Sequence, residues 1–257
     1  MMDVNKIVLG DCLEKIYELE EKSVNLILTD PPYNIGQDSK LTWAGGEMLT
    51  NSVAWGNSFN DNRSESDYGL FIKNLSDAFD YVLAEEGSII TFFDRGKPYY
   101  LKPLYDAFSF RNMIIFVKKN PSPHLRKNNY RSTFEQCAWF SREKYNINFL
   151  SQQNMKNVFS GLGGRLMGSS MLNENKKTEH PTEKYEWMIQ PLVKRHSNPG
   201  DLILDPMCGS GTTCAVAKKM GRKYIGIEID EGWFKVAQNR VNNTSVNLES
   251  FGVWGVV

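Results

Sequence analysis

The stretch DLILDPMCGSGTTCAVAKKMGRKYIGIEID, residues 201–230, decides the fold of this chain. Its pattern predicts an apolar strand, a glycine-rich turn, a helix and a second strand that ends in an acid. Gly209 and Gly211 allow the backbone to turn sharply and to approach a ligand, and the exposed amides where the helix begins favour an anionic group. Glu228 follows Gly209 by about 19 residues, near the offset of about 20 at which an acid binds ribose hydroxyls in dinucleotide-type folds.

This turn is neither GxGxxG nor the GxxxxGK[ST] of a phosphate loop, which disfavours a pyrophosphate dinucleotide and a nucleoside triphosphate. S-adenosylmethionine needs an adenosine pocket and a cradle for its amino-acid end, and it carries no pyrophosphate. The turn therefore fits that cofactor, while a purely structural strand-to-helix turn stays open as the alternative.

The alternation of strands and helices extends through most of the chain. Short β-branched and aromatic runs predict strands: KIVLGD, VNLILTD, GSIITFFD, NMIIFVK, QCAWFSR, LILDP and KYIGIEID. Between them apolar residues recur at helical spacing, as at Tyr68, Phe71, Ile72, Leu75, Phe79 and Val82. This order predicts an α/β fold with a doubly wound, mostly parallel sheet covered on both faces. We expect one domain over residues 1–257.

Two stretches interrupt the alternation. Residues 35–67 are rich in Gly, Ser, Asn and Asp without sustained periodicity, which is typical of a flexible lid loop. Residues 146–179 are polar and contain GLGGRLMGSS, which predicts an irregular inserted region.

A second informative stretch, VNLILTDPPYNIG at residues 24–36, places Asp30, Pro31, Pro32 and Tyr33 directly after a strand. In open α/β sheets ligands bind at this carboxyl edge. The prolines fix the chain and leave carbonyl oxygens free to accept hydrogen bonds, which suits an amine. A rigid turn with a core tyrosine is the structural alternative.

These residues predict a way to activate an exocyclic base amine, whose lone pair is delocalised into the ring. The Asp30 carboxylate and the Pro31 carbonyl would hold its hydrogens and direct the lone pair toward a methyl sulfonium, so alignment contributes more than strong base catalysis. Tyr33 offers a face on which the base can stack. An amine inside a duplex has to be extruded first, and the lid at residues 35–67 would close over it.

Net charge gives no support for nucleic-acid binding, because 30 Lys and Arg balance 30 Asp and Glu. The distribution of charge does, since residues 107–134 are basic and contain no acid. A phosphate backbone would favour this stretch, with a solvated charged face as the alternative. The candidate DNA-binding residues in it are Lys118, Lys119, Asn120, His124, Arg126, Lys127 and Arg131.

The four cysteines form no CxxC pair and have no partnered histidine spacing, so we expect reduced thiols, without a disulfide framework or a metal site. The chain begins without a basic segment followed by an apolar run, and no stretch approaches the length of a membrane span. A cytoplasmic protein is therefore expected.

The motifs DPPY (residues 30–33) and DPMCGSGTT (residues 205–213) together resemble those of amino-group DNA methyltransferases, which methylate N6 of adenine or N4 of cytosine. Their order, with DPPY first, is similar to the permuted beta group of that family. HPTEKYEWMIQPLV, residues 180–193, resembles the family's segment before the glycine motif, although Tyr185 stands where proline is usual. GDCLEKI, residues 10–16, resembles the segment whose acid reaches the cofactor adenine.

The resemblance implies S-adenosylmethionine as cofactor, DNA as substrate and no metal. It implies that the base is held by Asp30, Pro31, Pro32 and Tyr33. The implied cofactor-binding residues are Asp11, Cys12, His180, Thr182, Lys184, Asp205, Pro206, Gly209, Ser210, Gly211, Thr212 and Glu228. It further implies a target-recognition role for residues 146–179. A homodimer and a cognate restriction endonuclease that acts on the same site are compatible with the resemblance, and the sequence leaves both open.

The resemblance also bears on the target base. Aspartate at the first motif position accompanies mainly N6-adenine methylation in this family, and serine mainly N4-cytosine, so Asp30 favours adenine. Cytosine C5 chemistry needs a cysteine nucleophile, and the only Pro-Cys-like context, PMC at 206–208, belongs to the glycine motif. The alternatives that stay open are N4 of cytosine, an amine in RNA or a protein amide, and a catalytically silent nucleic-acid-binding module.

Overall fold

The structure is a computed structural model that describes residues 2–34, 63–121, 130–162 and 184–246. Its strands are β1 (Lys6–Leu9), β2 (Val24–Thr29), β3 (Leu83–Phe92), β4 (Ser109–Lys118), β5 (Phe134–Ser141), β6 (Val158–Gly161), β7 (Leu202–Asp205) and β8 (Lys223–Glu228). Its helices are α1 (Cys12–Lys15), α3 (Glu65–Val82), α4 (Lys102–Ala107), α5 (Glu186–His196), α6 (Thr212–Lys219) and α7 (Glu231–Asn242), with 3₁₀ turns η1 (Ile16–Glu18) and η2 (Pro98–Leu101).

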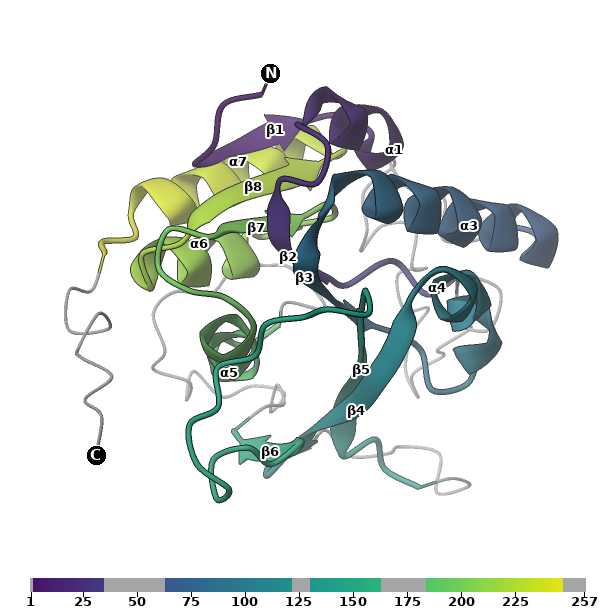
Figure 1. Ribbon diagram of the computed structural model, residues 1–257, viewed down its shortest axis with the longest axis vertical. Helices are drawn as coiled ribbons and strands as arrows, with labels where there is room; N and C mark the ends of the chain where they lie inside the picture. The colour runs from purple at the N-terminus through teal and green to yellow at the C-terminus, as the bar shows by residue number, and fades with distance from the viewer. Residues whose placement is uncertain (1, 35–62, 122–129, 163–183, 247–257) are drawn as a thin grey trace, which may run out of the picture.

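The described strands form one sheet in the order β1-β8-β7-β2-β3-β5-β4-β6 (Figure 1). Neighbouring strands are parallel except at β5, which runs antiparallel to both β3 and β4. Because β5 is the one reversed strand, β1, β8, β7, β2, β3 and β4 all end at the same edge of the sheet. Among the described residues, that edge carries the start of GDCLEKI, the DPPY motif and the glycine motif.

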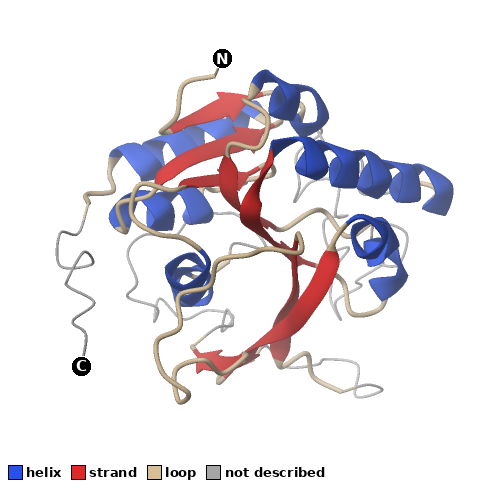
Figure 2. Ribbon diagram, viewed as in Figure 1, coloured by secondary structure: helices blue, strands red, loops and turns tan. Residues whose placement is uncertain are grey.

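Both faces of the sheet are buried, as neighbouring residues of β2 show. Ile27 packs in a core cluster with residues of α1, α3 and α4, whereas Leu26 and Leu28 pack with residues of α5, α6 and α7. Figure 2 shows the helices flanking the strands on both sides. This two-sided cover confirms the doubly wound, mostly parallel α/β sheet predicted from the sequence.

Helix α3 begins earlier than the predicted lid allowed. The Ser64 hydroxyl caps it by accepting a hydrogen bond from the Asp67 amide at 3.1 Å, and the next turns place the predicted apolar stripe in the core. Residues 64–67 therefore belong to the helix and its cap, and the predicted lid boundary at 67 was wrong. The rest of that prediction, residues 35–62, lies outside the described residues.

The predicted insertion over residues 146–179 is not irregular throughout. Strand β6 lies within it and extends the sheet by pairing parallel to β4, with Val158 opposite Ile115. The Trp187 indole donates to the Leu162 carbonyl at 2.7 Å and packs closely against Gly161. A short strand that is half exposed has no apolar run of its own, so its pairing partner decides its structure. Residues 163–179 lie outside the described residues.

The buried stripe of α3 yields a test of the core. We expect Phe79→Ala to lower the free energy of unfolding by about 3–5 kcal/mol, because Phe79 is 1% exposed and its loss leaves a cavity. Leu70→Ala on the same helix is the matched control, since Leu70 is 59% exposed and the change should stay within about 0.5 kcal/mol. Urea denaturation measures both, and equal effects would contradict the placement of α3.

Candidate active site at the carboxyl edge of the sheet

Four acidic side chains from distant parts of the sequence lie where parallel strands end. Asp11 follows β1, Asp30 follows β2, Asp205 ends β7 and Glu228 ends β8. These strands are neighbours and run in one direction, so their carboxyl ends share one edge. Ligands of open α/β sheets bind at this edge. The structure thus brings the predicted cofactor half and acceptor half of the site together.

The glycine motif forms a tight turn between β7 and α6. Gly209 and Gly211 have φ angles of 51° and 79°, which favour glycine. A Cβ on Gly211 would also lie 2.9 Å from the Cβ of Ala237 on α7. The Gly209 amide donates to the Glu228 carboxylate at 2.8 Å, which ties the turn to the end of β8.

Glu228 presents a buried carboxylate with capacity left for a ligand. Its Oε2 accepts the Gly209 amide and its Oε1 accepts the Asp230 amide at 2.9 Å. Burial raises the pKa of this carboxyl. The Ile229 amide also stabilises the charged form. A carboxylate can accept about four hydrogen bonds, so the group keeps capacity for a ligand hydroxyl. That capacity fits the ribose of an adenosine cofactor.

Other predicted cofactor residues form the walls around this turn. Asp11 caps α1 by accepting one of its backbone amides at 2.8 Å. Burial raises the pKa of the Cys12 thiol to about 12, so the thiol stays neutral. Arg240 on α7 donates to the Ser210 and Thr212 hydroxyls at 3.1 and 2.5 Å. These contacts hold the walls of the predicted cofactor site in place.

Asp205 couples the two halves of the site electrostatically. Its carboxyl is buried, and burial raises its pKa to about 7, against hydrogen bonds from the Thr213 hydroxyl and the Met207 amide. The negative charges of Asp30 and Glu228 raise it further. The next residue, Pro206, is buried as well. An edge with this much negative charge favours a cationic ligand.

Asp30 is held from two sides. The Tyr33 hydroxyl donates to Oδ1 at 2.5 Å, and the Lys184 ammonium lies 2.5 Å from Oδ2. The Asp30 side chain is 25% exposed, so a ligand can still reach it. The family resemblance counts Lys184 among the cofactor-binding residues, whereas in the structure its ammonium contacts the acceptor half.

The two prolines differ in what their carbonyl groups do. The Tyr68 hydroxyl of α3 donates to the Pro32 carbonyl at 2.6 Å. Within the described ranges, no residue donates to the carbonyl of Pro31. The carbonyl of Pro31, a buried residue beside Asp30, therefore keeps its capacity to accept a hydrogen bond, whereas that of Pro32 is used by Tyr68.

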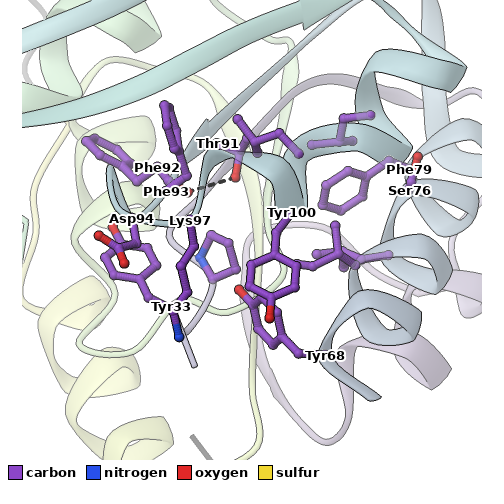
Figure 3. Close-up of a pocket in the computed structure, with 15 residues that line it drawn as sticks. Tyr33, Tyr68, Ser76, Phe79, Thr91, Phe92, Phe93, Asp94, Lys97 and Tyr100 are labelled. Carbon is purple, nitrogen blue, oxygen red and sulfur yellow. Dashed lines mark hydrogen bonds between the residues drawn. The ribbon is translucent and has the colours of Figure 1, made fainter. Parts of the chain in front are cut away.

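A small apolar cavity lies beside Tyr33, between α3 and β3 (Figure 3). Its volume of about 20 Å³ suits one water molecule and is far too small for a nucleobase. The Tyr100 hydroxyl is buried in its wall and has no hydrogen-bond partner among the described residues. The cavity thus lies behind the acceptor site and is not the binding pocket itself.

Asn34 fastens the chain directly after the DPPY motif. Its side chain donates to the Arg63 carbonyl at 3.0 Å and accepts the Arg63 amide at 2.8 Å. Its own carbonyl accepts the Lys97 ammonium at 2.8 Å, and its φ of 54° is a left-handed value that asparagine tolerates. Asn34 and Arg63 are therefore held together just after Tyr33.

Sequence reasoning missed Asn34 and Glu135. Glu135 lies near the start of β5, where it pairs with Lys118 of β4, and its Oε2 lies 4.0 Å from the Lys184 ammonium. A lone acid that precedes the apolar run QCAWF was the signal that could have identified it. The Asn34 signal was weaker, because its partner lies 29 residues away across a segment without a pattern.

The candidate DNA-binding residues fall into three groups. Lys118 turns inward to Glu135, and Arg131 donates to the Pro121 carbonyl. Lys119 is exposed just beyond β4, at the same edge as the acceptor site, and Asn120 is half-buried beside it. The remaining three lie outside the described residues: His124, Arg126 and Lys127.

Two predicted cofactor residues, His180 and Thr182, also lie outside the described residues. Tyr185, which stands where the family usually has proline, is the cap of α5 with φ −78° and ψ 144°. A proline would adopt the same backbone there, so this departure leaves the local path unchanged.

All four cysteines are free and buried. Over the ranges that the structure describes, no three His, Cys, Asp or Glu side chains gather as metal ligands. The described helices include none with the length and apolar character needed to cross a bilayer.

Comparisons with known proteins agree with this geometry. Residues 24–239 match the model of the N6/N4 methyltransferase family, described as DNA methylase. The chain is 30% identical over 254 residues to the type II methyltransferase M.HinfI of Haemophilus influenzae, over 95% of this chain and 70% of that protein. It is 26% identical to the type II methyltransferase M2.LlaDCHI of Lactococcus lactis subsp. cremoris, over 92% and 88%. The crystal structure of the M1.HpyAVI–SAM complex shares the fold, with a TM-score of 0.66, 24% identity, and coverage of 92% and 98%.

The buried carboxyl of Asp205 predicts a pH-dependent stability. Its pKa is raised from 3.8 to about 7, so the native state binds its proton more tightly than the unfolded chain. The stability of the protein relative to Asp205→Asn should therefore fall as the pH rises from about 4 to 7, by up to about 1.4 kcal/mol per pH unit. Urea denaturation of both proteins across this range measures the difference. Parallel pH profiles would contradict the burial of this carboxyl.

Proposed function

This chain belongs to the N6/N4 family of DNA methylases, and from that premise we propose that it methylates N6 of adenine in DNA, with Asp30 holding the amine. The coarser activity, methyl transfer from S-adenosylmethionine to DNA, is that of the family. The observation that supports methylation of an amine is the pair of acceptors at the carboxyl edge, the Asp30 carboxylate and the Pro31 carbonyl, beside the Tyr33 ring, and the choice of adenine rests on aspartate at position 30.

The residues at the carboxyl ends of β1, β7 and β8 fit the cofactor. Glu228 would accept the ribose hydroxyls, Asp11 would reach the adenine, and the turn at Gly209 and Gly211 would let the backbone approach the ligand. The acidic edge around Asp205 favours a cation. When bound, S-adenosylmethionine supplies a methyl group on a positively charged sulfonium, which leaves as a neutral thioether.

The acceptor residues act by alignment. One hydrogen of the amine would bond to Asp30 and the other to Pro31, which turns the nitrogen lone pair out of the ring system. Tyr33 would stack on the base, and its hydroxyl fixes the Asp30 carboxylate. Transfer of the methyl group forms a carbon–nitrogen bond and releases one proton from the amine, for which the Asp30 carboxylate is the adjacent acceptor.

The target base is the finer part of the proposal. Aspartate at position 30 favours adenine by resemblance to the family. Methylation of N4 of cytosine uses the same acceptors for a similar amine, and it is the second candidate for that reason. An amine in RNA or in a protein would need the same acceptor pair without the basic stretch.

We also propose how the rest of the chain serves DNA binding. Residues 1–257 would form one methyltransferase domain, with residues 35–62 around the flipped base and residues 146–179 reading the target sequence. A homodimer would let a second copy contact more DNA. The type II methyltransferase M.HinfI supports the idea of a cognate restriction endonuclease acting on the same site.

The decisive experiment incubates the protein and tritiated S-adenosylmethionine with unmethylated genomic DNA, RNA and total protein in parallel. Digestion of each polymer then identifies the labelled nucleoside or amino acid. We expect N6-methyl-2′-deoxyadenosine from DNA. Label in N4-methylcytosine would correct the base and keep the acceptor geometry, whereas label in RNA or protein alone would overturn the proposal.

Substitutions at the acceptor site give a sharper expectation. Asp30→Ala should lower kcat by roughly 100-fold or more, because the amine loses its charged acceptor. Tyr33→Phe keeps the ring and removes only the hydroxyl that donates to Asp30, so it should lower kcat much less. Single-turnover methylation measures both, with binding of S-adenosylhomocysteine as the test of folding. Full activity of Asp30→Ala would refute the assigned role.

The exposed lysine beyond β4 tests the DNA-binding surface. We expect Lys119→Gln to weaken DNA binding and to reduce the slope of log K against log salt by about 0.9, the value for one lost phosphate contact. Lys223→Gln is the matched control, because Lys223 is exposed at the opposite edge of the sheet, where β8 begins. Equal slopes for the wild type and both variants would argue against a phosphate contact at Lys119.

A further inference from the structure

Four charged side chains of alternating sign lie in a row at the active edge. Lys118 pairs with Glu135, the Glu135 carboxylate lies 4.0 Å from the Lys184 ammonium, and that ammonium lies 2.5 Å from Asp30. The row starts on β4, crosses the start of β5 and ends at the DPPY turn. Asp30 is thus the last member of an ion-pair network, and the proposed mechanism gives no role to the other three members, Glu135 among them.

The network is well shielded from solvent at its centre. The Lys184 side chain is 12% exposed, and its ammonium lies 4.9 Å from the Phe92 ring centroid and 5.8 Å from that of Tyr33. Burial lowers the pKa of a lysine, but the charges of Asp30 and Glu135 more than compensate and raise it above its usual value. Lys184 therefore stays protonated because two carboxylates share it.

We propose that Glu135 is a positioning residue for methyl transfer, which acts through Lys184 to orient Asp30 and to keep it a strong hydrogen-bond acceptor. A lysine that paired with Asp30 alone would offset most of the negative potential of the Asp30 carboxylate. The negative charge of Glu135 cancels part of the ammonium's positive potential at Asp30, so that Asp30 can still accept the amine hydrogen. This inference rests on the proposed function, which assigns the amine to Asp30.

The groups that face Lys184 come from three directions. Asp30 and Tyr33 follow β2, Phe92 ends β3, and Glu135 and Cys137 stand on β5. Glu135 in turn faces Lys118 and the charge of Arg95. Only Asp30 and Glu135 are anionic partners of the ammonium among these, so removing either charge should make Lys184 lose its proton at lower pH.

The first test replaces Glu135 by glutamine, which keeps the shape of the side chain and removes its charge. We expect kcat for DNA methylation to fall roughly 10- to 100-fold while KM for S-adenosylmethionine and for DNA changes little, because the alignment of Asp30 is lost and the binding residues stay. The alkaline limb of the kcat profile should also move to lower pH. An unchanged kcat and pH profile would overturn the inference.

The matched control breaks another ion pair of β5, at its opposite end. Arg142 follows that end of the strand and pairs with Asp80 of α3 at 2.7 Å, so Asp80→Asn makes the same chemical change away from the site. Its kcat and pH profile should match those of the wild type. Equal losses in Asp80→Asn and Glu135→Gln would show that Glu135 is only structural.

A double-mutant cycle then asks whether Glu135 acts through the lysine. Lys184→Met should lower kcat, and Glu135→Gln combined with it should lower kcat no further. Additive losses would overturn the proposed route. If Glu135→Gln does not fold, as judged by binding of S-adenosylhomocysteine, Glu135→Asp replaces it. The shorter carboxylate keeps the charge but lies farther from Lys184, so the kcat of Glu135→Asp should fall by less than the 10- to 100-fold predicted for Glu135→Gln. A kcat equal to that of the wild type would show that the position of the Glu135 carboxylate does not matter.

The two proposals fail in different ways. A wild-type protein that labels no DNA amine would sink the proposed function. A wild-type protein that methylates DNA, combined with a Glu135→Gln variant of equal kcat, would sink only the role of Glu135.

Discussion

The parallel pairing of β2 with β7 is the constraint on which the rest of the structure depends. It joins a strand near the start of the described chain to one near its end, with Leu26 opposite Ile203, and Asn25 reinforces it by accepting the first amide of β7 at 2.9 Å. A slip of one residue would move the acceptor turn by about 3.3 Å along the glycine turn and would turn the side chains of β2 to the other face. Chemistry that depends on alignment does not survive such a shift, so the register of two buried strands sets the distance between the base site and the cofactor site.

The buried negative charge at the carboxyl edge is a second constraint on the structure. Parallel strands collect their terminal acids at one edge, and burial makes this costly, as the raised pKa values of Asp205 and Glu228 show. The described part of the edge has two ways to offset the cost. Backbone amides of the glycine turn and of the start of α7 bind Glu228, and the Lys184 ammonium is shared between Asp30 and Glu135. The first arrangement leaves room for hydroxyls and the second leaves an acceptor for an amine, so the same electrostatic problem is solved differently in the two halves of the site.

Much of this could be predicted from the sequence, because the strong signals are local. Seven strands, the helix stripe of α3 and the glycine turn each show in a run of neighbouring residues, and the DPPY turn follows its strand directly. What could not be predicted depends on partners that are distant in sequence. Strand β6 is too short and too exposed to stand out, and β4 decides its conformation. The contacts of Asn34 with Arg63 and of Lys184 with Asp30 join residues whose spacing follows no period. The start of α3 was mispredicted for a local reason. Ser64 is one of several serines in a polar stretch, and only its hydrogen bond with the Asp67 amide marks it as the cap.

The bonds between Asn34 and Arg63 have a consequence for how enzymes of this design can diversify. They make a closed loop of the segment between them, and the entropy of closing a loop rises only slowly with its length, by about 0.6 kcal/mol per doubling. Once the two ends are fastened, insertions and deletions between them need not disturb the turn that carries Asp30. The hydrogen bonds between Asn34 and Arg63 thus separate a part of the protein that must keep its geometry from a part whose length can change at a small cost in free energy. Changes of length can then accumulate in that segment while the chemistry of methyl transfer is inherited intact.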